Sequence, residues 1–450
     1  MRVAEGGSSV AEGGVRVAEG GSGVARGGSA VTAEPVWMRS LRSAARERFA
    51  AMAWPTTAEE EWRRTDVSRL SLESYVPAPL LTPACPREAD RAAGGGFGAA
   101  SGVIRFQANK CTEVGLSEEL QRAGVRLLPL DNALEEFETQ LHALYQQALT
   151  EADNRFLAWH YAELSHGALL WVPPGIEIKE PFFVEFEEDG APGTMSAPHL
   201  AVLLGAGARA SVVQHIAAHT RATGGILCNA VVDMRLAEAS ALQIWEQQEL
   251  APGDLYVRHA RAEVGRDASL RHFDAEFGGK WAKTRVDCSL DGPGAEAFLD
   301  GVYYCGAGQY MDLRTVQRHR SPKASSRAVY KGAVAGGGRT IFQGLIEVAT
   351  GAAGTDAFLT NRNLILGEAA RSDSIPTLKI GNNDVKCSHG STTGKLNADE
   401  LFYLESRGYS TADAREMLVV GYFEDLLTSA PEKFKDNALA AIRGRLRTAA

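Results

Sequence analysis

The chain has 450 residues, of which 45% are hydrophobic and 23% are charged, so it has enough apolar side chains to bury a large core. Its 56 acidic residues outnumber its 47 Lys and Arg residues, and the net charge of -9 argues against a nucleic-acid or anionic-membrane partner. No apolar run is as long as a membrane helix, and six cysteines without CxxC spacing favour free thiols in a cytoplasmic protein.

The N-terminal third changes character twice. Residues 1–35 are a degenerate Gly/Ala-rich repeat, which predicts a disordered tail that lacks the apolar core of a secretory signal. Residues 36–165 predict a mainly helical subdomain. Its expected parts are a helix from Val36, a second helix opened by Thr56 or Thr57 and reaching about Leu70, a glycine-rich loop over 83–102, a helix over 131–149 and a helical piece over 154–164.

From residue 166 onward the hydrophobic period changes. Short apolar runs such as LLWVP, FFVEF, SVVQHI, ILCNAVV and TIFQGLIEV alternate with Gly, Pro, Asp and Asn, which is typical of strands and turns. Helical patterns are almost missing from this stretch for more than two hundred residues. The sequence therefore predicts a mainly β region over 166–390.

A repeat within this region decides between kinds of β structure. A small residue precedes a strand about every 29 residues, and the positions are Ala208, Ala239, Ala268, Ala295, Ala324 and Ala353. A constant period is expected when each coil buries its apolar face against the next coil, whereas a β-sandwich has no reason to repeat in this way. We therefore predict a right-handed parallel β-helix, a solenoid flanked by N-terminal and C-terminal helical subdomains.

The run from Asp384 to His389 predicts a strand that carries a thiol and an imidazole. Because strand side chains alternate between two faces, Cys387 and His389 should point the same way. A free Cys is often a small core residue and a lone His is often a hydrogen-bonded bystander, so both structural and ligand roles stay open. If they bind iron, other residues must complete the site, because a metal or cluster needs about four ligands.

The last region, residues 391–450, predicts a helical subdomain. One helix should run from Asn397 to Arg407, with Gly408 at its C-terminal end, and another from Thr411 to about Leu427, capped by Ser410. Its aromatic residues are more numerous than one buried face needs. We expect a partner surface that includes Tyr403, Tyr422 and Phe423, although such faces are more often core.

Several segments of the chain resemble one known family. The run DVKCSHGSTTGKL, followed by LFYLESRGYS and AREMLVVGYF, is similar to the C-terminal signature of the SufB/SufD family of iron-sulfur cluster assembly proteins, and KCSHG resembles the SufD branch. The resemblance extends upstream through HRSPKASSRAVYKGAV, TIFQGLIEV and TDAFLTNRNLIL to WPTTAEEEWRRTDVSRL. The chain departs from the family pattern at residues 391–393, at Lys395 and at Tyr409. None of these positions is Cys387 or His389.

This resemblance implies a scaffold role in the SUF system and not an enzyme activity. The chain would pair with a SufB-like subunit, or with a second copy of itself, and its C-terminal helices would hold a SufC-like ATPase. Cys387 and His389 would lie near the contact with SufB and take part in binding transient iron or a nascent cluster. The chain itself should bind no nucleotide, because Gly390–Leu396 has neither the spacing nor the Ser/Thr of a P-loop.

A second functional class stays open at this stage. Some parallel β-helices cleave acidic polysaccharides with carboxylates and basic residues on successive coils. Asp287, Asp300 and Asp312 are candidates for such a groove, although the sequence does not show whether they share a face.

Overall fold

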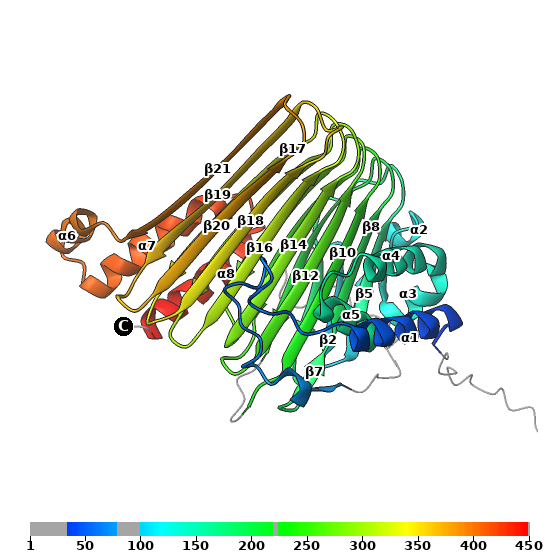
Figure 1. Cartoon of the computed structure of the whole chain (residues 1–450), viewed down its shortest axis with the longest axis horizontal. Coiled ribbons are helices and arrows are strands. Elements are labelled where there is room, and N and C mark those ends of the chain that lie inside the picture. Colours follow the sequence, from blue (N-terminus) through cyan, green and yellow to red (C-terminus); the bar gives the residue numbers. More distant parts are fainter. Residues whose placement is uncertain (1–33, 79–99, 219–223, 449–450) are drawn as a thin grey trace, which may run out of the picture. The chain divides into compact units, whose positions relative to one another are not determined.

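Two large β-sheets form most of the computed structural model, and the chain passes from one sheet to the other in each coil (Figure 1). The structure describes residues 34–78, 100–218 and 224–448. It is a parallel β-solenoid of about eight turns with helices toward both termini, so the predicted fold class is confirmed. The predicted disordered tail and most of the predicted glycine-rich loop lie outside the described residues.

Each coil contributes one strand to each sheet. Sheet A contains the parallel strands β5 (His166–Val172), β8 (Pro198–Leu204), β10 (Leu227–Leu236), β12 (Leu255–Val264), β14 (Trp281–Leu290), β16 (Tyr310–His319), β18 (Arg339–Val348) and β20 (Arg371–Ile380). Sheet B contains β6 (Phe182–Glu187), β9 (Arg209–Ala217), β11 (Ala241–Glu249), β13 (Ser269–Glu276), β15 (Glu296–Cys305), β17 (Ser325–Val334), β19 (Thr355–Ile365) and β21 (Val385–Lys395). The short strand β7 (Thr194–Ser196) pairs with β10 and with β1 (Val76–Pro77).

The main core lies between the two sheets. Every second side chain of a strand points inward, where residues in the same register stack from coil to coil. A small residue is buried at the corner of the coil before several sheet B strands, as at Ala208, Ala268, Ala295 and Ala324. In two coils the predicted repeat position is wrong. Ser240 and Thr355 occupy the buried corner position there in place of the predicted Ala239 and Ala353, and Ala239 lies in a turn with φ of 57°.

At one end of the solenoid, strands from the N-terminal third continue both sheets. On sheet B, β2 (Gly102–Gln107) pairs with β6, and β3 (Lys110–Leu116) pairs with β2 in antiparallel fashion. On sheet A, β4 (Arg126–Pro129) pairs in antiparallel fashion with β5, and the short helix α2 (Glu118–Arg122) connects β3 to β4. The segment predicted to be mainly helical therefore also contains four strands of the two sheets, namely β1, β2, β3 and β4.

The N-terminal helices pack on the outer face of sheet A. They are α1 (Val36–Ala51), α3 (Leu130–Glu136), α4 (Glu138–Thr150) and α5 (Arg155–Glu163). The single helix predicted over 131–149 is two helices, because Phe137 leaves the helical conformation, with φ of -116°, and packs its ring against Trp171. The helical piece predicted over 154–164 is α5, and the Asn154 side chain caps it by accepting from the backbone N–H of Leu157.

The helix predicted from Thr56 to about Leu70 is wrong. This segment forms turns that lead to the 3₁₀ helix η1 (Leu72–Ser74), and it crosses the outer face of sheet A. Contacts with sheet A override the helical tendency: Glu61 pairs with Arg285, and the Thr65 hydroxyl donates to Asp312. We call residues 54–75 the strap.

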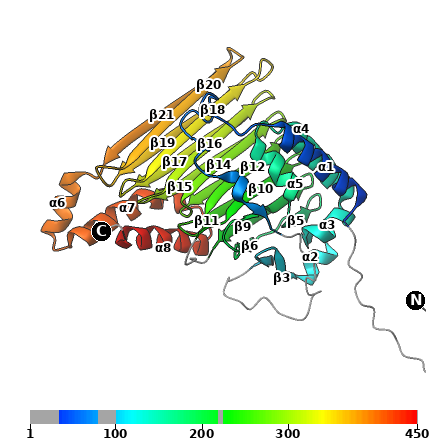
Figure 2. The ribbon, with the colours of Figure 1, turned by 60° about the horizontal axis from the view of Figure 1, so that its bottom comes forward.

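The C-terminal region forms three helices, α6 (Ala398–Ser406), α7 (Thr411–Leu427) and α8 (Glu432–Thr448). Both predicted helix signals are confirmed. The backbone N–H of Asp413 donates to Ser410 Oγ at 3.1 Å, and Gly408 ends α6 with φ of 96°. Figure 2 shows α7 and α8 lying against sheet B, where they bury a second apolar cluster with its outer face.

Candidate functional site

Cys387 and His389 lie on β21, the last strand of sheet B. The parallel register sets Cys387 beside Ala357 and His389 beside Leu359 on β19. Both neighbours are 1% exposed and belong to the main core. The thiol and the imidazole therefore continue two inward-facing columns of the solenoid, on one face of β21.

The two side chains differ in their surroundings. Cys387 is partly buried against the core, whereas His389 is exposed. Burial, assisted by the charge of Asp356, raises the pKa of the Cys387 thiol above its ordinary value. The thiol is therefore protonated at neutral pH, and a metal ion would have to displace that proton to gain a thiolate ligand.

The last coil is open. β20 and β21 are the terminal strands of their sheets, and within residues 34–78, 100–218 and 224–448 no strand pairs with their outer edges. Leu378 and Val385 are only partly buried although they pack on the core, and Ile380 is 41% exposed. An open coil with apolar side chains and free edge groups is suited to pairing with another chain.

A different group of potential ligands lies deep inside the solenoid. Glu246, His272 and Asp274 are the described residues whose ligand atoms approach one another closely enough for a metal ion. Arg258 lies among them, 2.6 Å from Glu246 and 2.8 Å from Asp274, so a cation already neutralises these carboxylates. Burial alone would raise the pKa of Glu246, but Arg258 and His272 lower it to about 2. This group is an ion-paired part of the core and includes neither Cys387 nor His389.

The structure separates the three aromatic residues predicted to form the partner surface. Phe423 is fully buried between α7, α8 and sheet B, which corrects the prediction that its ring is offered to a partner. Tyr422 is half-buried, with the Lys331 ammonium 4.7 Å from the centre of its ring. Tyr403 is 55% exposed on α6.

Sequence reasoning missed other exposed apolar residues beside Tyr403. Phe402 is 71% exposed, and Tyr409 and Met417 are also exposed. Helix α6 has no buried residue, although its sequence ADELFYLES contains four large apolar side chains. That composition on a short helix was the available signal, because so many apolar residues should bury a face of the helix unless a partner covers them.

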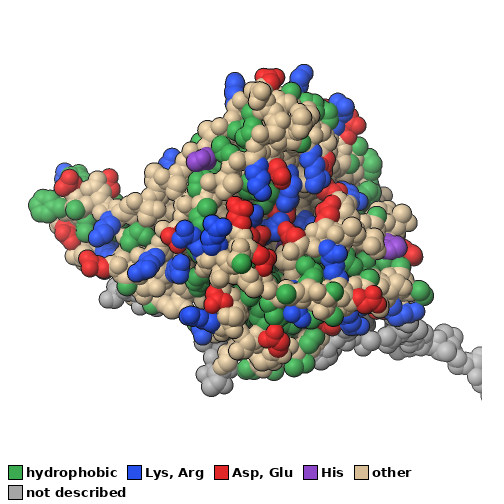
Figure 3. Space-filling view, in the orientation of Figure 1, with side chains coloured by type: hydrophobic (Ala, Val, Ile, Leu, Met, Phe, Trp, Pro, Cys, Tyr) green, Lys and Arg blue, Asp and Glu red, His purple; other side chains and the backbone are tan. Residues whose placement is uncertain are grey.

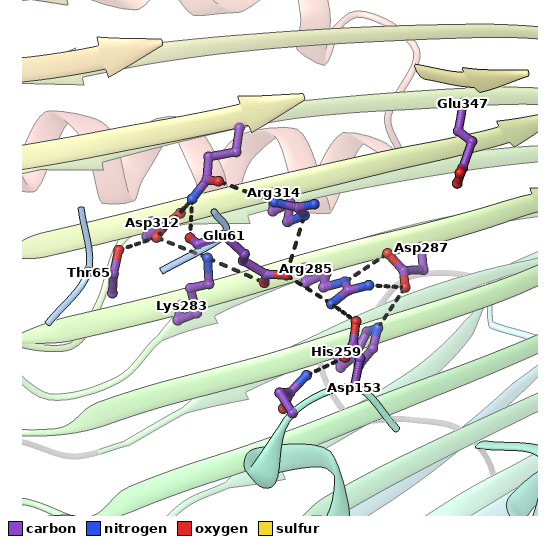
Figure 4. Close-up of polar contacts among 12 residues, drawn as sticks. Glu61, Thr65, Asp153, His259, Lys283, Arg285, Asp287, Asp312, Arg314 and Glu347 are labelled. Carbon is purple, nitrogen blue, oxygen red and sulfur yellow. Dashed lines mark hydrogen bonds and ion pairs between the residues drawn. The ribbon is translucent and has the colours of Figure 1, made fainter. Parts of the chain in front are cut away.

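A dense network of ion pairs lies under the strap on the outer face of sheet A (Figure 4). Glu61 reaches Arg285 at 3.0 Å and Lys283 at 3.6 Å, and Lys283 also pairs with Asp312 at 2.9 Å. Arg285 in turn holds Asp287 through two hydrogen bonds. These groups are already paired with one another, so they do not offer the free carboxylates of a catalytic groove.

The three aspartates considered for such a groove do not share a face. Asp287 and Asp312 lie on the outer face of sheet A, whereas Asp300 follows the inward-facing Leu299 and therefore lies on the outer face of sheet B. A cavity of about 300 Å³ does open beside Asp287, and Figure 3 shows acidic and basic side chains mixed on this face. Its lining residue His259 pairs with Asp287 at 3.2 Å.

Comparison with known proteins identifies the family. The family model described as "SUF system FeS cluster assembly, SufBD core domain" matches residues 186–422, which is more than half of the chain. The chain belongs to the SufBD family. The match begins in β6 and ends in α7, so it includes most of the solenoid, the open coil and α6.

Several curated relatives carry the name iron-sulfur cluster assembly SufBD family protein. The chain is 35% identical over 194 residues to one from Mycobacterium leprae, a match that covers 41% of this chain and 50% of that protein. It is 29% identical over 303 residues to one from Mycobacterium tuberculosis, covering 65% and 74%, and 26% identical over 319 residues to one from Staphylococcus epidermidis, covering 71% and 68%. The chain thus spans half the length of the Mycobacterium leprae relative.

Proposed function

We propose that this SufBD family protein is a scaffold subunit of the SufD type, and that it is not itself an enzyme. In this proposal it pairs through the open last coil with a SufB-like subunit in a cytoplasmic SUF complex. A SufC-like ATPase docks on its C-terminal helices, and the chain itself binds no nucleotide. The assembled complex supports the entry of iron and the formation of a cluster.

The observation that carries this proposal is the position of Cys387 and His389 at the open coil. One thiol and one imidazole supply two of the roughly four ligands that iron or a cluster requires. A second chain paired with the edges of β20 and β21 would lie next to both residues and could supply the remaining ligands. The cluster is then a product held between subunits and not a resident cofactor of this chain.

The proposed docking surface for the ATPase is the exposed apolar side of α6 with the start of α7. Phe402, Tyr403, Tyr409 and Met417 supply the exposed apolar area, and aromatic anchors of this kind contribute much of the energy at protein interfaces. Replacing Phe402 and Tyr403 together by Ala should weaken capture of the ATPase without lowering the melting temperature. Equal capture by this variant would remove α6 from the docking surface.

The central experiment is anaerobic cluster reconstitution on the complex with its SufB-like partner. The His389→Ala complex should assemble normally but hold less iron and show weaker visible cluster absorption than the wild-type complex. Cys387→Ser should reduce cluster content less, because Cys387 also has a place in the core. His142→Ala provides the matched control, since His142 is an exposed histidine on α4, distant in sequence from β21.

Equal cluster content in the wild-type and His389→Ala complexes would remove His389 from cluster formation and leave this chain as a structural half of the scaffold. A cluster of full occupancy on the isolated chain would contradict the shared site. The polysaccharide-cleaving alternative is not favoured, because its candidate aspartates lie on two different faces and those on sheet A are already ion-paired.

A further inference from the structure

A row of alternating arginine and phenylalanine residues crosses the outer face of sheet B. Arg271 on β13 is in register with Phe298 on β15, Phe298 with Arg327 on β17, and Arg327 with Phe358 on β19. All four follow an inward-facing residue, so their side chains lie together on the outer face. We call these four residues the Arg–Phe ladder.

The ladder is accessible, and its two arginines form no ion pair within 4 Å with a described carboxylate. Arg271 and Arg327 are exposed, Phe358 is 39% exposed and Phe298 is partly exposed. The Arg271 guanidinium carbon lies 4.2 Å from the centre of the Phe298 ring. Among the described residues, neither arginine forms a salt bridge or a hydrogen bond with another side chain.

Carboxylates of the same face border the ladder without pairing with it. Glu296 and Asp356 are exposed two residues before Phe298 and Phe358, and Asp300 lies two residues after Phe298. Burial raises the pKa of Asp300 to about 6, against the opposing effect of Arg327 and Arg271. These carboxylates disfavour a polyanion such as nucleic acid and favour a ligand with a few placed negative charges.

The same face already accommodates helices next to the ladder. The row of residues two positions further along each strand begins with Phe273, which stacks edge to face on Phe434 of α8. Beyond it, Val302 and Ala333 are buried under α7 and α8. The Arg–Phe ladder is therefore an uncovered strip beside a helix-covered part of sheet B.

The spacing of the ladder fits a helix better than a strand. Neighbouring strands are about 4.8 Å apart, so the two arginines lie about 9.6 Å apart and so do the two phenylalanines. A helix rises about 1.5 Å per residue, and positions i, i+3, i+7 and i+10 lie at about 0, 4.5, 10.5 and 15 Å on one face. An extended strand presents same-face side chains about every 6.7 Å and falls out of step with the ladder after one residue.

We propose that the Arg–Phe ladder docks an acidic amphipathic helix of a partner protein. Acidic side chains at i and i+7 pair with the two arginines, and apolar side chains at i+3 and i+10 pack on the two phenylalanines. This surface lies on the outer face of sheet B and uses neither the open coil nor α6. The inference therefore does not depend on the proposed scaffold function.

The test uses the full chain and a synthetic fluorescent helical peptide. The peptide has Glu at positions 4 and 11 and Leu at positions 7 and 14 of an otherwise Ala/Gln helix, and binding is followed by anisotropy at low and high salt. We expect saturable binding that weakens with salt. The double change Arg271→Glu with Arg327→Glu should weaken it by more than about tenfold, and Phe358→Ser by a few-fold. Glu296→Gln with Asp356→Asn should strengthen it a few-fold.

Two controls isolate the ladder. Arg371→Glu changes an exposed arginine on sheet A and should leave binding unchanged. A peptide of the same composition with its Glu residues spaced five apart should bind about tenfold more weakly, because it cannot match the row. Circular dichroism and melting temperature verify that every variant is folded.

Three results would overturn the proposal. Equal affinity for the two peptides would show that the arginines form only a general basic surface. Unchanged binding by the double arginine variant would place the peptide elsewhere on the chain. Tighter binding of a single-stranded oligonucleotide than of the matched peptide would assign the ladder to nucleic acid instead of a helix.

Discussion

The two ends of the solenoid differ in how the inward face of the terminal coil is covered. At the first end, which we call the sealed end, β2, β3 and β4 continue the sheets and α2 joins β3 to β4, while Ile104, Phe106 and Leu127 fill the interior. At the open end, formed by β20 and β21, the equivalent interior positions include Leu378 and Cys387, which remain only partly buried.

The difference indicates at which end of the solenoid another chain would bind. A coil can bury its inward face only against the next coil, so an end must be capped within the chain or be completed by another chain. The sealed end places antiparallel strands at both edges, which ends the parallel repeat. The open end keeps the parallel edges available and carries a thiol and an imidazole beside them. The open end thus leaves apolar side chains only partly buried where the sealed end covers them within the chain.

The largest expected effect separates the two ends by stability. Phe106 is 3% exposed and stacks on Phe186 with ring centres 5.1 Å apart, so Phe106→Ala should lower the free energy of unfolding by about 3–5 kcal/mol. Ile380→Ala at the open end should cost less than about 1 kcal/mol, because that side chain is 41% exposed. Urea unfolding of both variants measures the difference, and similar losses would contradict the contrast between the ends.

The next prediction concerns the pH dependence of stability and rests on Glu276, a carboxyl group buried in the middle coils. Burial raises the pKa of Glu276 from 4.5 to about 8, although Arg258 lies 3.7 Å away. Below pH 4.5 the carboxyl group is protonated in both states. Between 4.5 and 8 only the unfolded state loses the proton, so the stability that this group contributes is lost as the pH rises through this window.

The neutral variant Glu276→Gln should escape this loss. Its free energy of unfolding should equal that of the wild type near pH 4 and exceed it by a few kcal/mol at pH 9, since one pKa unit is about 1.4 kcal/mol. Urea unfolding at several pH values provides the measurement, with Glu296→Gln, an exposed carboxylate on β15, as control. Parallel pH profiles for the wild type and Glu276→Gln would show that Glu276 is ionised in the folded chain.

A smaller effect concerns pairing at the open end. Leu378→Asp puts a charge on the inward face of β20, where we propose that the SufB-like partner completes the coil. The affinity of the complex should fall at least about tenfold, because a buried unpaired charge is costly, whereas the isolated chain should keep its melting temperature within a few degrees. Thr377→Asp, on the opposite face of β20, is the matched control. Full affinity of the Leu378→Asp chain would move the pairing surface away from this coil.

The smallest expected effect is a difference in the chemical reactivity of the Cys387 thiol. Cys111, Cys228, Cys288 and Cys305 are buried, whereas Cys387 is partly exposed. In a Cys85→Ser background, iodoacetamide should label Cys387 first under native conditions. Because the pKa of this thiol is raised, the labelling rate should increase about tenfold per pH unit through neutral pH. Bound partner should block the reaction, and unchanged labelling in the complex would argue against contact at Cys387.

The sequence by itself determined the solenoid and the local features of its ends. Strand alternation is a property of the backbone, so it set Cys387 and His389 on one face without knowledge of the neighbouring strand. The period of about 29 residues arises because each coil packs on its neighbour, and this predicted the parallel fold. The caps at Ser410 and Gly408 were also readable, since a helix terminus is satisfied by residues next to it in sequence.

Only the tertiary structure decided which side chains are covered, because cover comes from segments far away in the sequence. Tyr403 and Phe423 are both aromatic residues in apolar stretches of the C-terminal helices. Helix α8 and sheet B bury Phe423, whereas Tyr403 stays exposed. The sequence around Glu61 favours a helix, but Glu61 instead pairs with Arg285, 224 residues away, and the strap lies on sheet A. The Arg–Phe ladder likewise exists only through the register of four strands, since its members are about 30 residues apart and no local pattern joins them.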